Sequence, residues 1–539
     1  MTRKCCVLIL AATIVALALR LPRLDQRPMH GDEAVHADKF RLLLEERFYE
    51  YDPEEYHGPT LNYLTLLPAW LKGARTLVQV DEFTLRIVPV FVGVCLILLL
   101  LPMTRGLGAA AAVCAALLTA ISPAMVYYSR YYIQEMLLVC FTFGAIVSGY
   151  RYARTRKIAW IISTGAFLGL MHATKETCVI AYASMFLALL LVLAIQRRTG
   201  SVASFRKMIK PSHLAAGIAA GAIVSALFFS SFLSNPSGIV DSIRTYTTYL
   251  GRAGTSPHIH PWYYYLKMLL YFRFGGGPLW TEAVIVLLAV VGFIAVMIKK
   301  SWPGADRGLL QFIAFYTLAM TVVYSAIPYK TPWCLLGFLH GMILLAGVGA
   351  VALVKVSPNV LPRLIVLSLL LEASAHLTWQ AYQSNYEYEA DSRNPYVYAH
   401  PTPEIFTVVD KMEQYAGVHQ DGHDMYIQVI CPGKDYWPLP WYLRHFSRVA
   451  WRDHVVNDEP AAPIILASDS DDIETALAHK LYTLTPLEDR QTYLFLFDKP
   501  YYVWLRPQVK LGGFVRKDLW AAMIDKSAPE VPAQEENGK

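Results

Sequence analysis

Long apolar runs separated by short polar turns dominate the first 380 residues of this chain. Each run approaches the roughly 20 residues that carry an α-helix across a bilayer. The runs lie at 5–21, 87–103, 107–128, 133–150, 158–174, 178–195, 214–233, 279–298, 309–327, 333–354 and 361–379. The pattern predicts a polytopic all-α membrane protein with about eleven transmembrane helices, in which 158–174 and 178–195 form a tight hairpin.

Composition and charge agree with this class. Hydrophobic residues make up 55% of the chain and charged residues only 17%, whereas charged residues make up about a quarter of ordinary soluble domains. Cytoplasmic loops are enriched in Lys and Arg. If the N-terminus is cytoplasmic, the inner connections hold seventeen such residues, while the short outer turns hold one each, namely Arg130, Lys175 and Lys330. We therefore expect a cytoplasmic N-terminus, and the net charge of +6 gives no sign of nucleic-acid binding.

The chain changes character near residue 381, where charged residues return. Strand-like runs occur at 425–430, 463–467 and 493–497, and helix-like stretches near 404–416 and 472–480. We expect residues 1–380 to form the transmembrane module, with long outer loops at 22–82 and 234–278. Residues 381–526 then form a small extracytoplasmic α/β domain, and the polar residues 527–539 a disordered tail. No cleavage site follows the first run, which is typical of an uncleaved signal anchor.

Residues capable of chemistry collect on the outer side of this topology. They are Asp32, Glu33, His36 and His57 in the first outer loop, Arg130 and Glu135 at the second outer turn, Lys175 and Glu176 at the third, His258 and His260 in the fourth outer connection, and Lys330 in the fifth. Charges at the centre of a bilayer are costly, but these lie at its surface. Cations and carboxylates gathered there suit an anionic lipid headgroup that is held and cleaved.

Several of these motifs resemble one known superfamily. The Asp32-Glu33 pair after the first run, His57-Gly58-Pro59 with Leu61 and Tyr63 behind it, and the Ser129-Arg130 turn are similar to C-type (GT-C) glycosyltransferases of the protein O-mannosyltransferase and aminoarabinose transferase group. This resemblance covers roughly residues 10–380. More narrowly, 329–333 (Tyr-Lys-Thr-Pro-Trp) and 435–444 resemble a prokaryotic subgroup related to archaeal glycosylation proteins, some of them flippase-associated.

The resemblance implies an enzyme that transfers a hexose or pentose from a polyprenyl-phosphate-linked donor to an acceptor hydroxyl outside a prokaryotic inner membrane. The acceptor class, whether protein, lipid or glycan, stays open. The resemblance also implies a single displacement with inversion and no nucleotide sugar, and the chain has no Gly-rich phosphate loop. Such a reaction needs cations to stabilise the leaving phosphate and a carboxylate to accept the acceptor's proton.

Roles for individual residues follow from the resemblance. Asp32 is the expected general base, and Glu33 is expected to orient the base or the acceptor. Arg130 is the leading candidate for the donor phosphate because a guanidinium binds phosphate bidentately; Lys330 follows, and Lys175 is third. The alternative for all three cations is snorkelling at the membrane surface. Tyr127, Tyr128, Tyr131 and Tyr132 around Arg130 are typical of an interfacial aromatic belt.

A divalent metal is an open alternative. Some relatives use one near this site, and Glu33, His36, His57, Glu135, His258 and His260 supply carboxylate and imidazole ligands. No two of them have the spacing of a known metal motif. Only one of the eight cysteines, Cys431, falls in the outer domain, so the sequence holds neither a disulfide framework nor a zinc spacing.

The outer domain carries aromatic residues that suit either sugar rings or the membrane surface. They are Tyr436, Trp437, Trp441 and Tyr442, and Arg444 beside them is a further candidate for a phosphate. The sequence does not decide between these uses.

Two other function classes compete with the transferase. A lipid-linked sugar flippase would need ionisable groups within the membrane and broken helices in both halves. Glu372 and His376, four residues apart on one helical face, are the one such pair, and we expect it to be buried and structural. A scaffold with a binding tail would leave the outer carboxylates unexplained.

Overall fold

The computed structural model describes residues 3–54, 57–198, 210–252, 258–298, 304–357 and 359–527. The chain forms two compact units. The first consists of Met1–Gln26 and Lys39–Tyr398, and the second of Arg27–Asp38 and Ala399–Lys539. Of the tail expected to be disordered, only Ser527 is among the described residues.

Every predicted apolar run of the first unit coincides with a helix. These are α1 (Arg3–Arg20), α4 (Glu82–Leu98), α6 (Ala109–Ile121) with α7 (Pro123–Ser129), α8 (Glu135–Thr155), α9 (Ile158–His172), α10 (Cys178–Arg198), α12 (Pro211–Phe229), α15 (Ala283–Ile298), α16 (Arg307–Ala326), α17 (Leu336–Val356) and α18 (Val360–Tyr382). The prediction of a polytopic helical membrane protein is thus confirmed.

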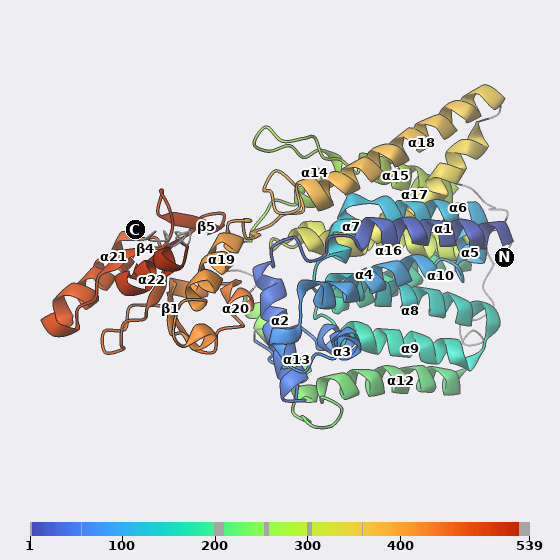
Figure 1. The fold of residues 1–539 in the computed structure, drawn as a ribbon. Coiled ribbons are helices and arrows are strands. Elements are labelled where there is room, and N and C mark those ends of the chain that lie inside the picture. The colour runs from blue at the N-terminus through green and yellow to red at the C-terminus, as the bar shows by residue number, and fades with distance from the viewer. Residues whose placement is uncertain are drawn as a thin grey trace, which may run out of the picture. The chain divides into compact units, whose positions relative to one another are not determined.

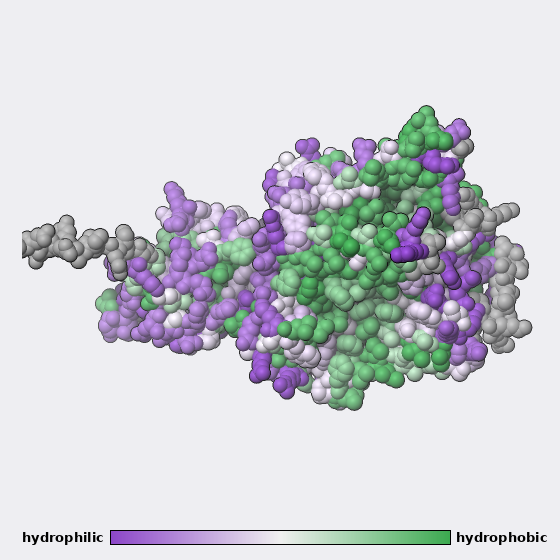
Figure 2. All heavy atoms as spheres, turned by 45° about the vertical axis from the view of Figure 1, so that its right-hand side comes forward, coloured by the Kyte–Doolittle hydropathy of each residue, from purple (hydrophilic) through white to green (hydrophobic). Residues whose placement is uncertain are grey.

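Six of the described helices are long and apolar enough to cross a membrane on their own. They are α8, α10, α12, α16, α17 and α18, and α6 with α7 makes a seventh if that bent pair is one span. Helices α9 and α15 are apolar but shorter. The figure of eleven spans therefore stays a prediction. Figure 2 shows apolar side chains gathered in a broad band over the helices of the first unit, with hydrophilic residues on either side.

The 60° bend between α6 and α7 has a local cause. Ser122 is extended, and its hydroxyl accepts the Met125 N–H as a helix cap. Pro123 follows at the first helical position, where its missing N–H costs nothing. The chain therefore ends one helix and starts another here, which places Tyr127 to Arg130 at the end of α7.

Helices also occupy the two long connections at 22–82 and 234–278. The first contains α2 (Gly31–Glu45), α3 (Thr60–Lys72) and the 3-10 turn Leu77–Gln79, and the second contains α13 (Gly238–Arg252) and α14 (Tyr264–Leu270). Shorter elements of the first unit are α5 (Thr104–Leu107), the 3-10 turn Pro332–Leu335 and the π turn Gln383–Glu387. Asp32 and Glu33 therefore lie in the first turn of a helix, where the dipole favours negative charge.

Glycines allow close packing between the helices of the first unit. Helices α8, α9 and α12 lie side by side (Figure 1). A Cβ atom built on Gly165 of α9 would lie 1.9 Å from the Gly217 carbonyl oxygen of α12. Gly169 and Gly221, one turn further along each helix, approach in the same way. Small residues at four-residue spacing are the usual basis of helix association in membranes, where backbones meet directly.

The second unit is an α/β domain around one mixed sheet. Its strand order is β2-β1-β3-β6-β4, with β5 paired to β6; β1 is parallel to β2 and β3, and the other pairs are antiparallel. The strands are β1 (Ile427–Ile430), β2 (Val449–Arg452), β3 (Ile464–Ser468), β4 (Tyr493–Phe495), β5 (Tyr502–Arg506) and β6 (Val509–Arg516). The helices are α19 (Ile405–Ala416), α20 (Leu439–Tyr442), α21 (Asp471–Ala478) and α22 (Lys517–Ser527), with short turns at Gly422–Asp424, Pro432–Lys434, His479–Leu484 and Leu487–Asp489.

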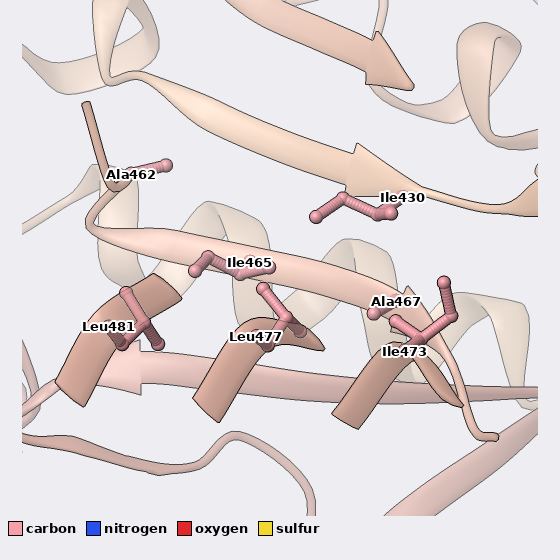
Figure 3. Packing of buried hydrophobic residues seen from close by; sticks show 7 residues of the cluster. All are labelled: Ile430, Ala462, Ile465, Ala467, Ile473, Leu477 and Leu481. Atoms are coloured by element: carbon pink, nitrogen blue, oxygen red, sulfur yellow. The ribbon is translucent and has the colours of Figure 1, made fainter. Parts of the chain in front are cut away.

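A compact apolar cluster holds helix α21 against this sheet. Figure 3 shows Ile473, Leu477 and Leu481 pointing from the helix and its continuation toward Ile465 and Ala467 of β3. The helical residues recur every four positions, so they share one face. The predicted strands at 425–430, 463–467 and 493–497 and both predicted helices are confirmed. Strands β2, β5 and β6 were not predicted.

The glycine contact between α9 and α12 gives a testable prediction. Gly165→Ala forces its methyl group into the Gly217 backbone, so we expect destabilisation by about 1–3 kcal/mol. Gly149→Ala in α8 is the matched control, because its methyl group meets no described atom within 4 Å. Thermal unfolding of the detergent-purified variants measures both. Equal midpoints for the two variants would show that the contact does not limit stability.

Candidate active site

The two carboxylates of the Asp-Glu pair have different surroundings. Glu33 is completely buried in the second unit. Its Oε1 accepts a hydrogen bond from Arg27 Nη2 (3.3 Å) and its Oε2 accepts the His30 N–H (3.0 Å). His30 precedes the first residue of α2 and Glu33 is its third, so Glu33 reaches back to cap the helix. Glu33 therefore fixes where α2 begins.

Asp32 is held differently. Its side chain is 50% exposed, and its carboxylate accepts no hydrogen bond from the described residues. The Asp32 backbone N–H donates to His30 Nδ1 (3.0 Å), so this nitrogen is an acceptor. The backbone of Asp32 is thus fixed while its carboxylate stays open to a substrate. His36, on the same helix, is buried.

The His-Gly-Pro motif brings one of the outer pairs together in the first unit. A Cβ on Gly58 would lie 2.2 Å from the Ala173 carbonyl oxygen, so only glycine allows this approach. His57 Nδ1 then lies 2.7 Å from Glu176 Oε2, and the Tyr51 hydroxyl donates to Glu176 Oε1 (3.1 Å). Burial raises the pKa of Glu176, but the charge and hydrogen bond of His57 and the charge of Lys175 outweigh it and lower that pKa to about 2.

The neighbouring Lys175 is paired with a second carboxylate. Its Nζ donates to Glu135 Oε1, and both side chains are buried. Cys334 is close enough to Lys175 and Glu135 to sense both charges. Glu135, Lys175, Glu176 and His57 are therefore brought together as predicted from the topology, but the charge of Lys175 is balanced by Glu135.

Arg130 donates hydrogen bonds to backbone carbonyl oxygens at the end of α1. Its Nη1 donates to the carbonyls of Arg20 (3.1 Å) and Pro22 (2.7 Å), and its Nη2 to that of Arg23 (3.2 Å). The guanidinium lies 4.7 Å from the ring centre of Tyr386 and donates to its hydroxyl. These contacts satisfy carbonyls that a helix C-terminus leaves unpaired. They give Arg130 a structural task, and its role toward a phosphate stays a prediction.

Lys330, like Arg130 and unlike Lys175, donates to backbone carbonyls. Its Nζ donates to the carbonyls of His260 (3.2 Å) and Ile327, and the side chain is 1% exposed. No carboxylate of the described residues forms an ion pair with it. Burial lowers the pKa of this ammonium. A bridge between Ile259 and Tyr329 aligns the two segments, so His258 and His260 lie beside Lys330.

Aromatic rings surround this lysine segment. Trp333 lies 5.8 Å from Tyr131 and 5.9 Å from Tyr398, measured between ring centroids. His258 Nδ1 lies 2.5 Å from the Tyr398 hydroxyl. The prediction that the tyrosines near Arg130 form an interfacial belt is wrong, because Tyr127, Tyr128, Tyr131 and Tyr132 are all 0% exposed. They pack inside the first unit, where the rings of Tyr128 and Tyr131 lie against Trp333.

The outer-domain aromatics divide into two groups. Trp441 is buried, and Arg444 lies 3.9 Å above its ring and donates to its carbonyl (2.7 Å), so this pair stabilises the domain. Tyr436 and Trp437 are half-buried neighbours with ring centroids 6.0 Å apart, and Tyr436 packs on Trp451 (4.8 Å).

Two further expectations concern metals and the membrane interior. Among the described residues no group of three or more His, Cys, Asp and Glu side chains could hold a metal ion. The expectation of a buried Glu372–His376 pair is wrong, since both side chains are exposed on α18. That helix has few buried residues.

Sequence reasoning missed one buried carboxylate, Glu282. It precedes α15, is 0% exposed, and accepts hydrogen bonds from the Ser122 hydroxyl (2.5 Å), the Ala124 N–H (3.0 Å) and the Tyr396 hydroxyl (2.7 Å). Burial raises its pKa, and these three hydrogen bonds oppose that effect. An acidic residue opening a strongly apolar run was the available signal. Glu282 ties the α6–α7 bend to the segment before residue 398.

Comparisons with known proteins agree with this architecture. Residues 64–232 match the family described as "Dolichyl-phosphate-mannose-protein mannosyltransferase". No curated protein sequence matches the chain. The crystal structure of ArnT from Cupriavidus metallidurans bound to undecaprenyl phosphate is similar, with a TM-score of 0.61 and 16% identity over 94% of this chain and 97% of ArnT.

A second similar structure is the Archaeoglobus fulgidus oligosaccharyltransferase tethered with an acceptor peptide. Its TM-score is 0.53, with 13% identity over 84% of this chain and 64% of that one. The archaeal oligosaccharyltransferase AglB from Archaeoglobus fulgidus, in complex with an inhibitory peptide and a dolichol-phosphate, also has a TM-score of 0.53, with 11% identity over 86% of this chain and 69% of that one. At these identities the structures establish the fold, and the family match adds the sequence evidence. The chain therefore has the fold of these glycosyltransferase structures, and residues 64–232 also resemble the mannosyltransferase family in sequence.

Proposed function

We propose that this enzyme transfers a sugar from a polyprenyl-phosphate donor to an acceptor hydroxyl on the extracytoplasmic face of a prokaryotic inner membrane. The acceptor oxygen attacks the anomeric carbon, the bond from that carbon to the phosphate oxygen breaks, and the polyprenyl phosphate leaves with the electron pair. The undecaprenyl phosphate bound to ArnT and the dolichol-phosphate bound to AglB support this class of donor. The acceptor is a protein, a lipid or a glycan.

The half-exposed Asp32 beside the buried Glu33 is the observation that carries this proposal. A general base needs a carboxylate that a substrate hydroxyl can reach. Asp32 meets this requirement, whereas both Glu33 oxygens are already bonded to Arg27 and His30. In the proposed reaction Asp32 accepts the acceptor's proton, and Glu33 holds the helix that presents it.

Lys330 is the cation that we assign to the donor phosphate. Arg130 is occupied by backbone carbonyls, and Lys175 by Glu135. The Lys330 ammonium has two carbonyl acceptors for three N–H donors, so one donor remains for an anion. A buried ammonium without a paired carboxylate gains strongly from an incoming phosphate. Burial of the site strengthens that attraction, because the local dielectric constant is low.

The aromatic rings next to Lys330 fit a sugar phosphate. Trp333, Tyr131 and Tyr398 offer ring faces beside the ammonium, and sugar C–H groups pack on such faces. His258 and His260 lie at the same place and offer further polar groups. A lipid-linked sugar flippase would also need a site for the headgroup, so this site alone does not distinguish a flippase from a transferase. Cleavage of the donor distinguishes them, because only a transferase breaks the bond between the sugar and the phosphate.

Removing the proposed base tests the role of Asp32. Asp32→Asn keeps the size of the side chain but cannot accept a proton, so sugar transfer should fall about 10²- to 10⁴-fold. The measurement is transfer of radiolabelled sugar from polyprenyl phosphate to acceptors in a membrane extract, with donor binding followed separately.

The matched control is Asp25→Asn, which removes an exposed carboxylate seven residues earlier in the chain. This variant should transfer sugar at the wild-type rate. Full activity of Asp32→Asn would remove the base role from Asp32. Loss of donor binding together with activity would instead assign Asp32 to binding.

The assignment of Lys330 to the donor phosphate is tested by measuring the KM for the donor. Lys330→Met should raise the KM for the donor about 10- to 100-fold, because a charge-assisted hydrogen bond contributes about 1.5–3 kcal/mol. Lys330→Arg, which keeps the charge, should lose less. An unchanged donor KM in Lys330→Met would show that another group holds the phosphate.

The pH dependence of donor binding has a defined sign. Lys330 is charged below its pKa, which burial lowers, so donor affinity in the wild type should decline as the pH rises through that lowered value. Lys330→Arg should move this decline to higher pH, because a guanidinium stays protonated. Identical alkaline profiles for the two proteins would contradict the assignment.

A further inference from the structure

The segment that carries Asp32 belongs structurally to the C-terminal domain. Residues Arg27–Asp38 form one compact unit with Ala399–Lys539, although about 360 residues of chain separate them. The chain returns to the first unit at Lys39. The proposed base is thus carried by a piece of the N-terminal region that the C-terminal domain incorporates.

Contacts with this domain hold the segment just before Asp32. The Met29 N–H donates to the Tyr442 hydroxyl (2.8 Å), and Tyr442 is buried with its ring packed edge-on against Phe406. Gly31 lies against Trp437, whose Cβ would be 3.8 Å from a Cβ on the glycine. Tyr442 and Trp437 both come from the 435–444 motif, so this motif supports the start of α2.

A second line of contacts leads to Asp32 itself. The rings of His30 and His400 lie 4.7 Å apart, and both residues are buried. The same His30 ring accepts the Asp32 N–H through Nδ1. Contact with His400 therefore holds the His30 ring in place, and that ring in turn holds the backbone of Asp32. The Asp32 carboxylate can then change its position only by rotation about its side-chain bonds.

Topology explains why this motif is suited to the task. Strand β1 is parallel to its two neighbours β2 and β3, and the motif follows directly after its carboxyl end. Sites in sheets of this kind form at the carboxyl ends of parallel strands, because the connecting loops gather there. The Asp435–Arg506 ion pair (2.6 Å) anchors the beginning of the motif to strand β5.

We propose that the C-terminal domain positions the catalytic carboxylate, with Tyr442 and His400 as positioning residues for Asp32. This inference rests on the proposed role of Asp32 as the base. Neither residue touches substrate in this account. Their effect is on the orientation of Asp32, and small displacements of a catalytic group lower the rate of the chemical step more than they lower substrate affinity.

The first test compares two tyrosine-to-phenylalanine variants of the full-length enzyme. Tyr442→Phe removes the hydroxyl that accepts the Met29 N–H and keeps the ring. Tyr493→Phe is the matched control, because it removes a hydroxyl bonded to the Ala462 carbonyl (2.8 Å) elsewhere in the same domain. Tyr442→Phe should lower kcat on the order of 10- to 100-fold with an unchanged donor KM, and Tyr493→Phe should leave kcat unchanged.

Hydrogen exchange supplies a readout that is independent of activity. Peptides covering residues 27–38 should exchange faster in Tyr442→Phe and at the wild-type rate in Tyr493→Phe. Two variants of His400 test its role in the same way. His400→Ala should lower kcat. His400→Phe places a ring opposite His30 again, so it should recover much of the lost kcat. Parallel behaviour of Tyr442→Phe and Tyr493→Phe in both kcat and exchange would overturn the proposal.

The result with Asp32→Asn separates this inference from the proposed function. If that variant is inactive while Tyr442→Phe matches its control, only the positioning role is overturned. If Asp32→Asn transfers sugar normally, the base role and the positioning role both fall. If both proposals hold, Tyr442→Phe should have no further effect in the Asp32→Asn background, because the group that it positions is already lost.

Discussion

The cost of burying a charge governs how the side chains of this protein are arranged. An unpaired ion in a low-dielectric interior is strongly unfavourable, and the buried charged groups in this chain have specific partners. Glu33 is held by Arg27, Lys175 by Glu135, Glu176 by His57, and Arg130 by three backbone carbonyls. Lys330 has carbonyl oxygens but no paired carboxylate, and the same is true of Arg20 and Lys480 among the described residues. The proposed chemistry uses the Lys330 ammonium and the half-exposed Asp32 carboxylate, whose Oδ1 lies 3.9 Å from His30 Nδ1.

The helical fold could be predicted from the sequence because it depends on local signals. Apolar runs of bilayer length predict helices whatever their neighbours, since backbone groups in lipid must be satisfied within the segment. The small domain could also be predicted where its strands are short and mostly apolar, as at 427–430 and 464–468. Strand β6 was missed because Gly512 and Gly513 interrupt its pattern, and β2 because it is only half-buried.

The residues of the candidate site could be predicted from the sequence, but the hydrogen bonds and ion pairs between them could not. The topology placed His57, Glu135, Lys175 and Glu176 on one face, and the structure joins them in two ion pairs. No sequence signal indicated that Arg130 caps α1, that four tyrosines beside it are buried, or that residues 27–38 join a domain more than 360 residues away. Such facts depend on tertiary contacts, which one sequence does not contain. Glu282 was missed for the same reason, because its three donors come from distant segments.

The central claim is that this protein breaks the bond between a sugar and a polyprenyl phosphate. The most direct measurement follows both products after purified enzyme in liposomes receives a doubly labelled donor and a membrane extract as the source of acceptor. Free polyprenyl phosphate should appear in a one-to-one ratio with glycosylated acceptor. Movement of intact donor across the bilayer, with neither product formed, would contradict it and favour a flippase.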